Sequence, residues 1–301
     1  MTGRIGRLFG RRQSPDISDD LWMWVVRTHP VLTGFATQRL ASLRELADSF
    51  LATRQLYPVG DTTVTAELRI SVAVQASLPV LELGLSWYKH WSTIVLTEEE
   101  FDVEMSDVDE AGVVHETEET ASGQFLPLGS IILSVADIRE SGWCDGYNVV
   151  IHEMAHVLDR TNGALDGAPR LHREMDQKVW TSIFTEAYRD LQQRVSGRRE
   201  RSGRSTHAPG KRNKGRQTGS QPVRSRPATR LDPYAAEAPE EFFAVASETF
   251  FEQPWVLADE YPGVYDQLRS FYRRDPRERI PSFASSRGGE GNRTGRFRGR
   301  D

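Results

Sequence analysis

The chemistry that this sequence suggests centres on two histidines and a glutamate. His152, Glu153 and His156 form the pattern H-E-x-x-H within residues 148–159. In a helix, residues four apart lie one turn apart on the same face, so both imidazoles can bind one metal ion. We predict zinc, because two imidazoles at about 2.0–2.1 Å supply half of a tetrahedral shell. A catalytic zinc site needs one further protein ligand and a water, and Glu153 is placed to be the general base.

The residues around this pattern favour a metal-binding helix over a chance match. H-E-x-x-H also occurs in amphipathic helices whose histidines are buried in the core without a metal. Here the intervening residues, Met154 and Ala155, are uncharged, as a buried metal helix requires. The flanking positions are all apolar: Val149, Val150, Ile151, Val157 and Leu158.

Asp159 stands at the end of the predicted helix, just before the stop signal Asn162-Gly163. A carboxylate in the last turn opposes the helix macrodipole by about 0.3–1 kcal/mol. A metal-binding histidine that donates its second ring N–H to Asp159 would offset this cost, so we predict that Asp159 supports the metal site. The alternative is that Asp159 points to solvent.

The composition indicates a globular protein of a reducing compartment. With 301 residues the chain is long enough for one large domain or two small ones with a sizeable core. The single cysteine, Cys144, excludes an intrachain disulfide framework and a cysteine zinc cluster. The sequence contains no apolar run of about 18 residues or more, and residues 1–12 lack the apolar region of a secretion signal. We therefore expect a cytoplasmic protein with no membrane partner.

The basic residues are concentrated in one segment. Residues 198–230 hold eleven Lys and Arg against one acid, Glu200, which gives this segment +10 and the remainder −15. We predict a disordered insertion at 196–230 and basic, flexible ends at 1–18 and 282–301. Because the remainder is acidic, nucleic-acid binding by the whole protein is disfavoured. Residues 198–230 are the only segment that we consider for contact with nucleic acid.

The periodicity predicts a mostly helical α+β domain built from residues 19–195 and 231–281. A core helix is indicated by an apolar stripe, and a second begins at the N-cap Thr65 and ends before Pro79. Residues 161–170 have the composition of a loop, and 171–195 predict a packing helix. His172, at the start of that helix, is weighed as a metal ligand, but a structural role is favoured. The apolar stripe of the first core helix comprises Leu40, Leu43, Leu46, Phe50 and Leu51.

A small mixed sheet is expected beside the H-E-x-x-H helix. Residues 91–96 predict a strand and 98–119 an acidic hairpin. Residues 129–134 predict a short apolar strand, followed by a helical turn that Ser134 caps. An edge strand can pair with an extended peptide, and we assign this substrate-binding role to three residues. They are Ile131, Ile132 and Leu133.

A downstream helix offers candidates for the third metal ligand. Pro239 suits the first position of a helix, whose positive N-terminal end favours the acidic residues that follow. A histidine as third ligand is disfavoured, because the metzincin pattern needs glycine at 159 and histidine at 162, where this chain has Asp159 and Asn162. The residues alone leave four candidates: Glu237, Glu240, Glu241 and Glu248.

Three separated motifs resemble the Mlc titration factor A family of bacterial zinc-dependent peptidases. They are VVIHEMAHVLD at 149–159, NGALDGAP at 162–169 and DPYAAEAPEEFFAVASETFFE at 232–252. The likeness extends upstream to LSWYKHWSTIVL at 85–96 and covers roughly residues 35 to 275. The basic insertion and tail depart from the family pattern.

The resemblance implies a gluzincin-like metallopeptidase with one zinc ion, whose third ligand is Glu241, seven residues after Tyr234. The family is also similar around the metal to the catalytic domain of anthrax lethal factor, which implies that Tyr234 donates its hydroxyl to the oxyanion. Beside a peptide or protein substrate, it implies a transcription repressor as a partner, since enterobacterial members bind the glucose repressor Mlc. The alternative function is a non-catalytic zinc-containing protein that sequesters a transcription regulator.

Overall fold

The structure is a computed structural model that describes residues 17–88, 91–98, 101–108, 114–121, 123–126, 130–203 and 229–279. Only the backbone is described between 101 and 126 and from 198 to 203. Most of the predicted insertion, 204–228, and most of the predicted flexible ends, 1–16 and 282–301, lie outside the described residues.

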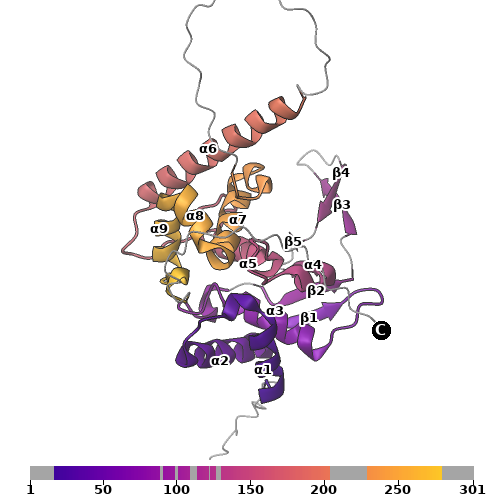
Figure 1. Ribbon diagram of the computed structural model, residues 1–301. Helices are drawn as coiled ribbons and strands as arrows, with labels where there is room; N and C mark the ends of the chain where they lie inside the picture. The colour runs from indigo at the N-terminus through magenta and orange to yellow at the C-terminus, as the bar shows by residue number, and fades with distance from the viewer. Residues whose placement is uncertain are drawn as a thin grey trace, which may run out of the picture.

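The described residues form helices and strands in the order seen in Figure 1. The α-helices are α1 (Asp19–Thr28), α2 (Thr37–Thr53), α3 (Ala66–Ser77), α4 (Val135–Glu140), α5 (Val149–Asp159), α6 (Gln177–Gly203), α7 (Pro239–Glu252), α8 (Pro254–Glu260) and α9 (Pro262–Phe271). The strands are β1 (Gln55–Pro58), β2 (Thr93–Thr97), β3 (Phe101–Val108), β4 (Val114–Ala121), β5 (Gly123–Leu126) and β6 (Ser130–Ser134). The mostly helical α+β architecture with a small mixed sheet is confirmed.

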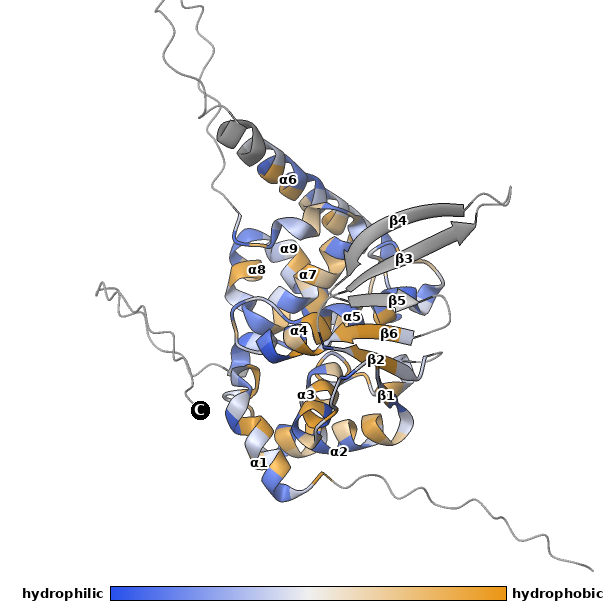
Figure 2. Cartoon of the chain, turned by 90° about the vertical axis from the view of Figure 1, so that its right-hand side faces the viewer, coloured by the Kyte–Doolittle hydropathy of each residue, from blue (hydrophilic) through white to orange (hydrophobic). Residues whose placement is uncertain are grey.

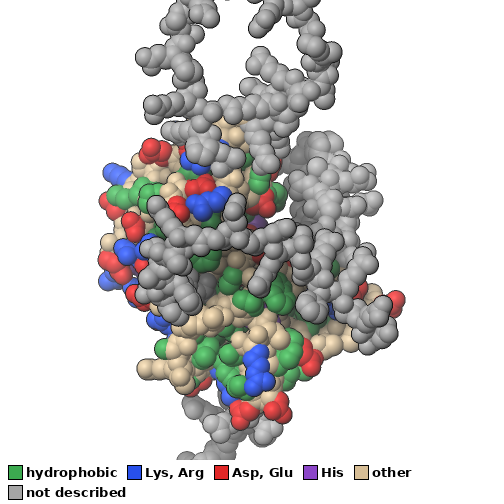
Figure 3. Space-filling model, viewed as in Figure 1, with side chains coloured by type: hydrophobic (Ala, Val, Ile, Leu, Met, Phe, Trp, Pro, Cys, Tyr) green, Lys and Arg blue, Asp and Glu red, His purple; other side chains and the backbone are tan. Residues whose placement is uncertain are grey.

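Helix α3 is the centre of the N-terminal part and packs against both α1 and α2. It begins as predicted at Thr65, whose hydroxyl accepts a hydrogen bond from the Leu68 N–H at 3.2 Å. Every residue of α3 from Ile70 to Ser77 is buried, which explains its near-continuous run of small and apolar side chains. Figure 3 shows hydrophobic side chains gathered on the lower half of one face, over these N-terminal helices.

The larger sheet has the strand order β1-β2-β6-β5. Strands β1, β2 and β6 are parallel, and β5 runs antiparallel to β6, with Phe125 opposite Ile131. In Figure 2 strands β1, β2 and β6 follow one another in this order, and the central strands β2 and β6 are strongly hydrophobic. Strand β1 was not predicted from the sequence.

The prediction that residues 131–133 form an edge strand is wrong. Strand β6 is hydrogen-bonded to β2 on one side and to β5 on the other, so its backbone has no free edge. Within the described residues the edge next to β6 belongs to β5. Ile131, Ile132 and Leu133 are buried accordingly. The predicted acidic hairpin is present as the antiparallel pair β3 and β4.

Helix α6 differs from its prediction at both ends. It begins at Gln177 instead of near 171, and it continues to Gly203, into the segment predicted to be disordered. Its buried aromatic residues Trp180 and Phe184 stack at 4.1 Å between ring centroids, and both contact Phe243 of α7. The described residues include no helix with both the length and the apolar character needed to cross a membrane.

Candidate metal centre

Helix α5 carries the H-E-x-x-H pattern into the interior. Its N-cap is Asn148, whose side-chain oxygen accepts a hydrogen bond from the Ile151 N–H at 3.0 Å. The helix packs against α3, α4, α7 and the sheet, so almost all of it is buried. His152 and His156 lie one turn apart, and their Nε2 atoms are 3.1 Å from each other. The structure thus brings the two imidazoles together as their spacing predicts.

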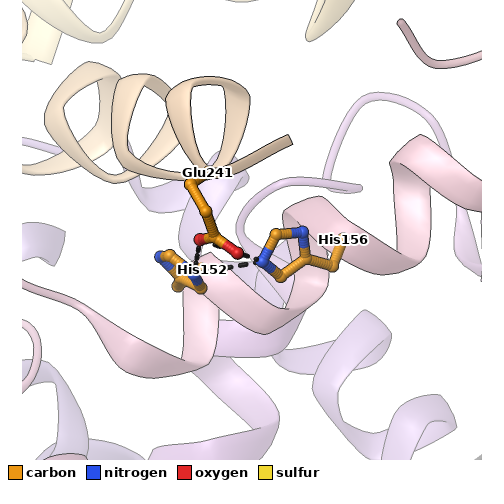
Figure 4. A group of neighbouring side chains, drawn as sticks. All are labelled: His152, His156 and Glu241. Carbon is orange, nitrogen blue, oxygen red and sulfur yellow. Dashed lines mark hydrogen bonds and ion pairs between the residues drawn. The ribbon is translucent and has the colours of Figure 1, made fainter. Parts of the chain in front are cut away.

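Glu241 reaches the two histidines from the first turn of α7, as Figure 4 shows. Its Oε2 lies 3.1 Å from Nε2 of His152 and 3.5 Å from Nε2 of His156. One ligand atom from each of the three residues lies within 4.8 Å of the other two. Two imidazole nitrogens and one carboxylate oxygen are the protein ligands of a known class of catalytic zinc sites. The residues present therefore fit a zinc ion.

Glu248 contacts His152 at Nδ1, the ring nitrogen that does not face Glu241. Its Oε1 lies 2.6 Å from Nδ1 of His152, and its Oε2 accepts a hydrogen bond from the Asn148 N–H at 2.7 Å. A carboxylate at Nδ1 holds the proton on that nitrogen, which leaves the Nε2 lone pair for a metal. Glu248, one of the four candidate ligands, therefore orients the imidazole of His152 instead of joining the group of three.

The electrostatics of the centre favour a cation. Burial alone would lower the pKa of His152, but Glu248 and Glu241 raise that pKa well above its ordinary value. Burial acts to raise the pKa of Glu241, but hydrogen bonds with His152 and His156 hold it well below its usual range. The acidic side chains thus stabilise positive charge at the histidines, which a proton or a divalent cation can supply.

Glu153 is a buried carboxylate next to the ligands. Its side chain is 2% exposed, and its Oε2 has no hydrogen-bond partner in the part of the chain that the structure describes. Burial raises the pKa of Glu153, although the two histidines act to lower it. A carboxylate with a raised pKa is a stronger base than an exposed one, so Glu153 is suited to accept a proton.

Asp159 takes neither of the two positions expected from the sequence. It is fully buried, so it does not point to solvent, and its Oδ2 accepts a hydrogen bond from the Gly167 N–H at 2.8 Å. Among the described residues, neither its Oδ1 nor Nδ1 of His156 has a hydrogen-bond partner, so the predicted bond is not formed. Burial raises the pKa of Asp159 to about 6. Asp159 therefore anchors the loop after α5.

Tyr234 lies beside the ligand group. It belongs to a short 3-10 helix, Pro233–Ala236, which Asp232 caps by accepting a hydrogen bond from the Tyr234 N–H at 2.9 Å. This helix packs against α6 and α7. The centroid of the Tyr234 ring is 6.1 Å from that of His152, and 51% of the residue is exposed. The ring of Tyr234 thus lies beside His152 and is about half exposed to solvent.

The remaining candidates lie outside the group of ligands. Nε2 of His172 donates a hydrogen bond to the Phe271 carbonyl oxygen at 2.8 Å, which is a structural role. Glu237 and Glu240 are not part of the cluster that could hold a metal ion.

Sequence reasoning missed two residues that support the site. The side chain of Asn148 donates to Oε1 of Glu252 at 2.9 Å, and Oε2 of Glu252 accepts from the Cys144 N–H at 2.5 Å. Asparagine just before an apolar helical run is an N-cap signal, so Asn148 could have been found. The role of Glu252 depends on how the end of α7 meets the loop before α5, and no local pattern encodes that contact.

Comparisons with known proteins agree with this geometry. The family model described as glucose-regulated metallo-peptidase M90 matches residues 7–273. Mlc titration factor A of Edwardsiella ictaluri is 29% identical over 272 residues, which cover 89% of this chain and 94% of the relative. Mlc titration factor A of Escherichia coli strain 55989 is 31% identical over 253 residues, which cover 83% and 85%. The chain therefore belongs to the M90 family of glucose-regulated metallo-peptidases.

Proposed function

We propose that this protein is a zinc-dependent peptidase of the gluzincin type, with His152, His156 and Glu241 as the metal ligands. The observation that carries the proposal is the convergence of these three ligand atoms within 4.8 Å of one another. A zinc ion held there supplies a Lewis acid that polarises the peptide carbonyl and makes the attacking water more acidic.

Glu153 is the general base of this proposal. It follows His152 directly on α5, and burial raises its pKa, so it can hold a proton during the reaction. Glu153 takes a proton from the attacking water and passes it to the leaving amine, which departs as a neutral group.

Tyr234 is the proposed donor to the oxyanion. Its ring lies beside that of His152 and is half-exposed, so the carbonyl of a bound peptide can approach it from solvent. A hydroxyl that donates a hydrogen bond to the developing negative charge lowers the barrier, and loss of one such donor costs about 10²–10³ in kcat.

The substitution Glu153→Gln tests the proposal most simply. We expect the variant to keep one zinc per chain and to lose hydrolysis by at least about 10²-fold, because the amide cannot accept the proton. The measurement is digestion of an unbiased peptide library, with metal analysis of the same samples. Glu240→Gln is the matched control, since Glu240 lies on α7 outside the ligand cluster and should leave turnover unchanged. Wild-type turnover by Glu153→Gln would show that the base assignment is wrong.

A second function, binding of a transcription regulator, is supported by the name that the relatives share, Mlc titration factor A. In this alternative the zinc has a structural role. A structural zinc site has four protein ligands and binds no hydroxamate, whereas a catalytic site has an open position for one. Saturable binding of a hydroxamate to the zinc-loaded protein would therefore favour the peptidase.

A further inference from the structure

A cavity lies next to the N-terminus of α5. It is lined by residues of α1, the first half of α3 and α4 and of the loops beside them, and none of the metal ligands lines it. Its volume is about 230 Å³. An apolar cavity of about 150 Å³ holds benzene, whereas sites for drug-sized ligands measure about 300–1,000 Å³. The cavity is therefore large enough for a group of one or two rings.

The walls of this cavity suit an aromatic occupant. Leu68 and Ile138 form part of its buried wall, at 8% and 2% exposure. Two further lining residues, Trp24 and Trp143, are 37% and 51% exposed and so stand on its solvent side. Indole rings offer stacked or edge-to-face contacts to a second ring, which are favourable beyond the apolar area that they bury.

His29 also lines the cavity, but its imidazole is already hydrogen-bonded within the protein and offers no positive charge. Nδ1–H of His29 donates to the Val25 carbonyl oxygen at 3.1 Å, and Nε2 lies 2.7 Å from the hydroxyl of Ser71, from which it accepts. Burial lowers the pKa of His29, which favours the neutral ring. The charged residues that line the cavity, Glu67 and Arg139, are exposed, and Arg139 pairs with Glu98 at 3.4 Å. The buried wall therefore offers an occupant mainly apolar surface, and an uncharged group suits it.

A continuous line of hydrogen bonds connects this wall with the metal site. The Ser71 hydroxyl accepts from Nε2 of Gln75 at 3.1 Å, and Oε1 of Gln75 accepts from Nδ2 of Asn148 at 2.8 Å. The Asn148 N–H donates to Glu248, whose other oxygen lies 2.6 Å from Nδ1 of His152. Four residues of this line are buried, and the fifth, His152, is partly buried.

A second contact joins the cavity to the same helix end. Ser141 lines the cavity, and its hydroxyl oxygen accepts a hydrogen bond from the N–H of Val149, the first residue of α5, at 3.0 Å. An occupant that shifts Ser71 or Ser141 therefore acts on the N-terminus of the helix that carries both metal-binding histidines.

We propose that this cavity binds one uncharged aromatic group and that this group and the metal ion bind cooperatively. The cooperativity, though not the binding itself, rests on the metal site of the proposed function. A metal ion that fixes His152 also fixes Glu248 and Asn148, and thereby orders the cavity wall. Binding to an ordered wall is tighter, and by linkage each ligand must then strengthen the other.

Titration calorimetry with indole tests the site on the full-length, zinc-loaded protein. We expect saturable binding of one indole per chain, weakened about three- to tenfold by Trp143→Ala, which removes one aromatic contact. Trp255→Ala is the matched control, because Trp255 on α8 is 42% exposed and does not line the cavity. Absence of saturable binding, or equal weakening by both substitutions, would overturn the proposal.

Filling the cavity provides a second, independent test. Leu68→Trp places a larger side chain where the occupant would lie, so we expect loss of indole binding while one zinc per chain remains. Indole binding that survives in a folded, zinc-loaded Leu68→Trp protein would contradict the assignment of the site.

The cooperativity is tested by repeating the titration after removal of the metal with EDTA. We expect indole to bind at least about fivefold more weakly, the lower end of typical coupling between sites. Equal affinities would overturn the cooperativity. The readout needs no peptidase activity, so a protein that binds zinc and indole cooperatively but cleaves no peptide would contradict only the proposed function.

A blocked peptide, acetyl-Ala-Trp-Ala-amide, identifies the source of the aromatic group. Tighter binding of the peptide than of indole, with both lost in the Leu68→Trp protein, supports the proposal with a polypeptide side chain as the occupant. Binding of indole alone supports it with a free small molecule. If neither binds, the cavity has no such function.

Discussion

At the scale of single residues, the separation between Glu241 and Glu248 decides their roles. They are seven residues apart on α7, which is about 10.5 Å along a helix. Only one of them can therefore reach a single metal ion from this face. Glu241 meets the Nε2 atoms and Glu248 meets Nδ1 of His152. The spacing could predict that one of them reaches the site. Which one does so depends on how far α7 is shifted along α5, and only the family resemblance indicated Glu241.

The substitution Glu248→Gln should weaken zinc binding without removing a ligand. An amide cannot accept a full charge-assisted hydrogen bond from Nδ1–H of His152, so the imidazole becomes a poorer ligand. We expect zinc affinity to fall about 10- to 100-fold in competition with a chelator. Glu240→Gln is again the control, and equal affinities in the Glu248→Gln and wild-type proteins would contradict the role given to Glu248.

Asp159 should make the metal-free protein less stable as pH rises. Its pKa is raised from 3.8 to about 6 in the folded state, so folding favours the protonated form. The stabilisation is complete below pH 3.8 and is lost as pH rises to about 6, a change of at most about 3 kcal/mol.

The substitution Asp159→Asn checks this sign. The amide keeps an oxygen for the Gly167 N–H and removes the charge. In urea unfolding with EDTA, we expect the variant to exceed wild type by about 1–3 kcal/mol above pH 6 and to match it near pH 4. A difference that does not change with pH would mean that Asp159 does not titrate in this way.

At the scale of elements, the contact between α5 and α7 builds the site. Along this contact, α7 places one acidic residue at Nε2 of His152 and of His156, a second at Nδ1 of His152 and a third at the N-cap of α5. They are Glu241, Glu248 and Glu252. The N-cap residue Asn148 is shared between this contact and α3, through Gln75. It therefore connects the metal site with the N-terminal part of the chain.

The substitution Asn148→Ala should be more costly than loss of an ordinary cap. It removes the cap of α5, worth about 0.5–2 kcal/mol, and leaves buried groups of Gln75 and Glu252 without their partner, worth about 1–3 kcal/mol more. We expect a loss of about 2–4 kcal/mol in denaturant unfolding. Thr65→Ala removes only the cap of α3 and should cost about 1 kcal/mol. Equal losses would contradict the shared role of Asn148.

Local patterns predicted the elements that depend on neighbouring residues. The caps at Thr65 and Ser134, the H-E-x-x-H helix and the β3–β4 hairpin all follow from residues a few positions apart. The edge position assigned to residues 131–133 failed because the preceding strand β5, which was not predicted, pairs with β6 and covers that edge. The position of Asp159 failed for a similar reason, because the loop after α5 folds back and places the Gly167 N–H against the carboxylate.

At the scale of the whole molecule, a bound metal would connect two parts that are distant in sequence. Its proposed ligands come from α5 and α7, with all of α6 between them along the chain. A ligand that binds only the folded state stabilises it, by about 2.7 kcal/mol when its concentration is 100 times its Kd.

Removal of the metal should therefore lower the melting temperature. At a zinc concentration about 100 times the Kd, we expect Tm to fall by about 5–10 °C on addition of EDTA, followed by scanning calorimetry. Returning zinc should restore Tm, whereas His156→Ala should show a much smaller response to either treatment. A Tm that is the same with zinc and with EDTA would argue against a site shared by α5 and α7.

The position of the bound metal is the most direct test of a catalytic zinc centre. Crystals grown with zinc and measured at the zinc absorption edge should contain one anomalous peak per chain at the centre of the ligand group. We predict that it lies about 2.0–2.2 Å from Nε2 of His152, Nε2 of His156 and a carboxylate oxygen of Glu241, with no fourth protein ligand. A peak elsewhere, a fourth protein ligand, or no peak at this position would contradict a catalytic zinc centre.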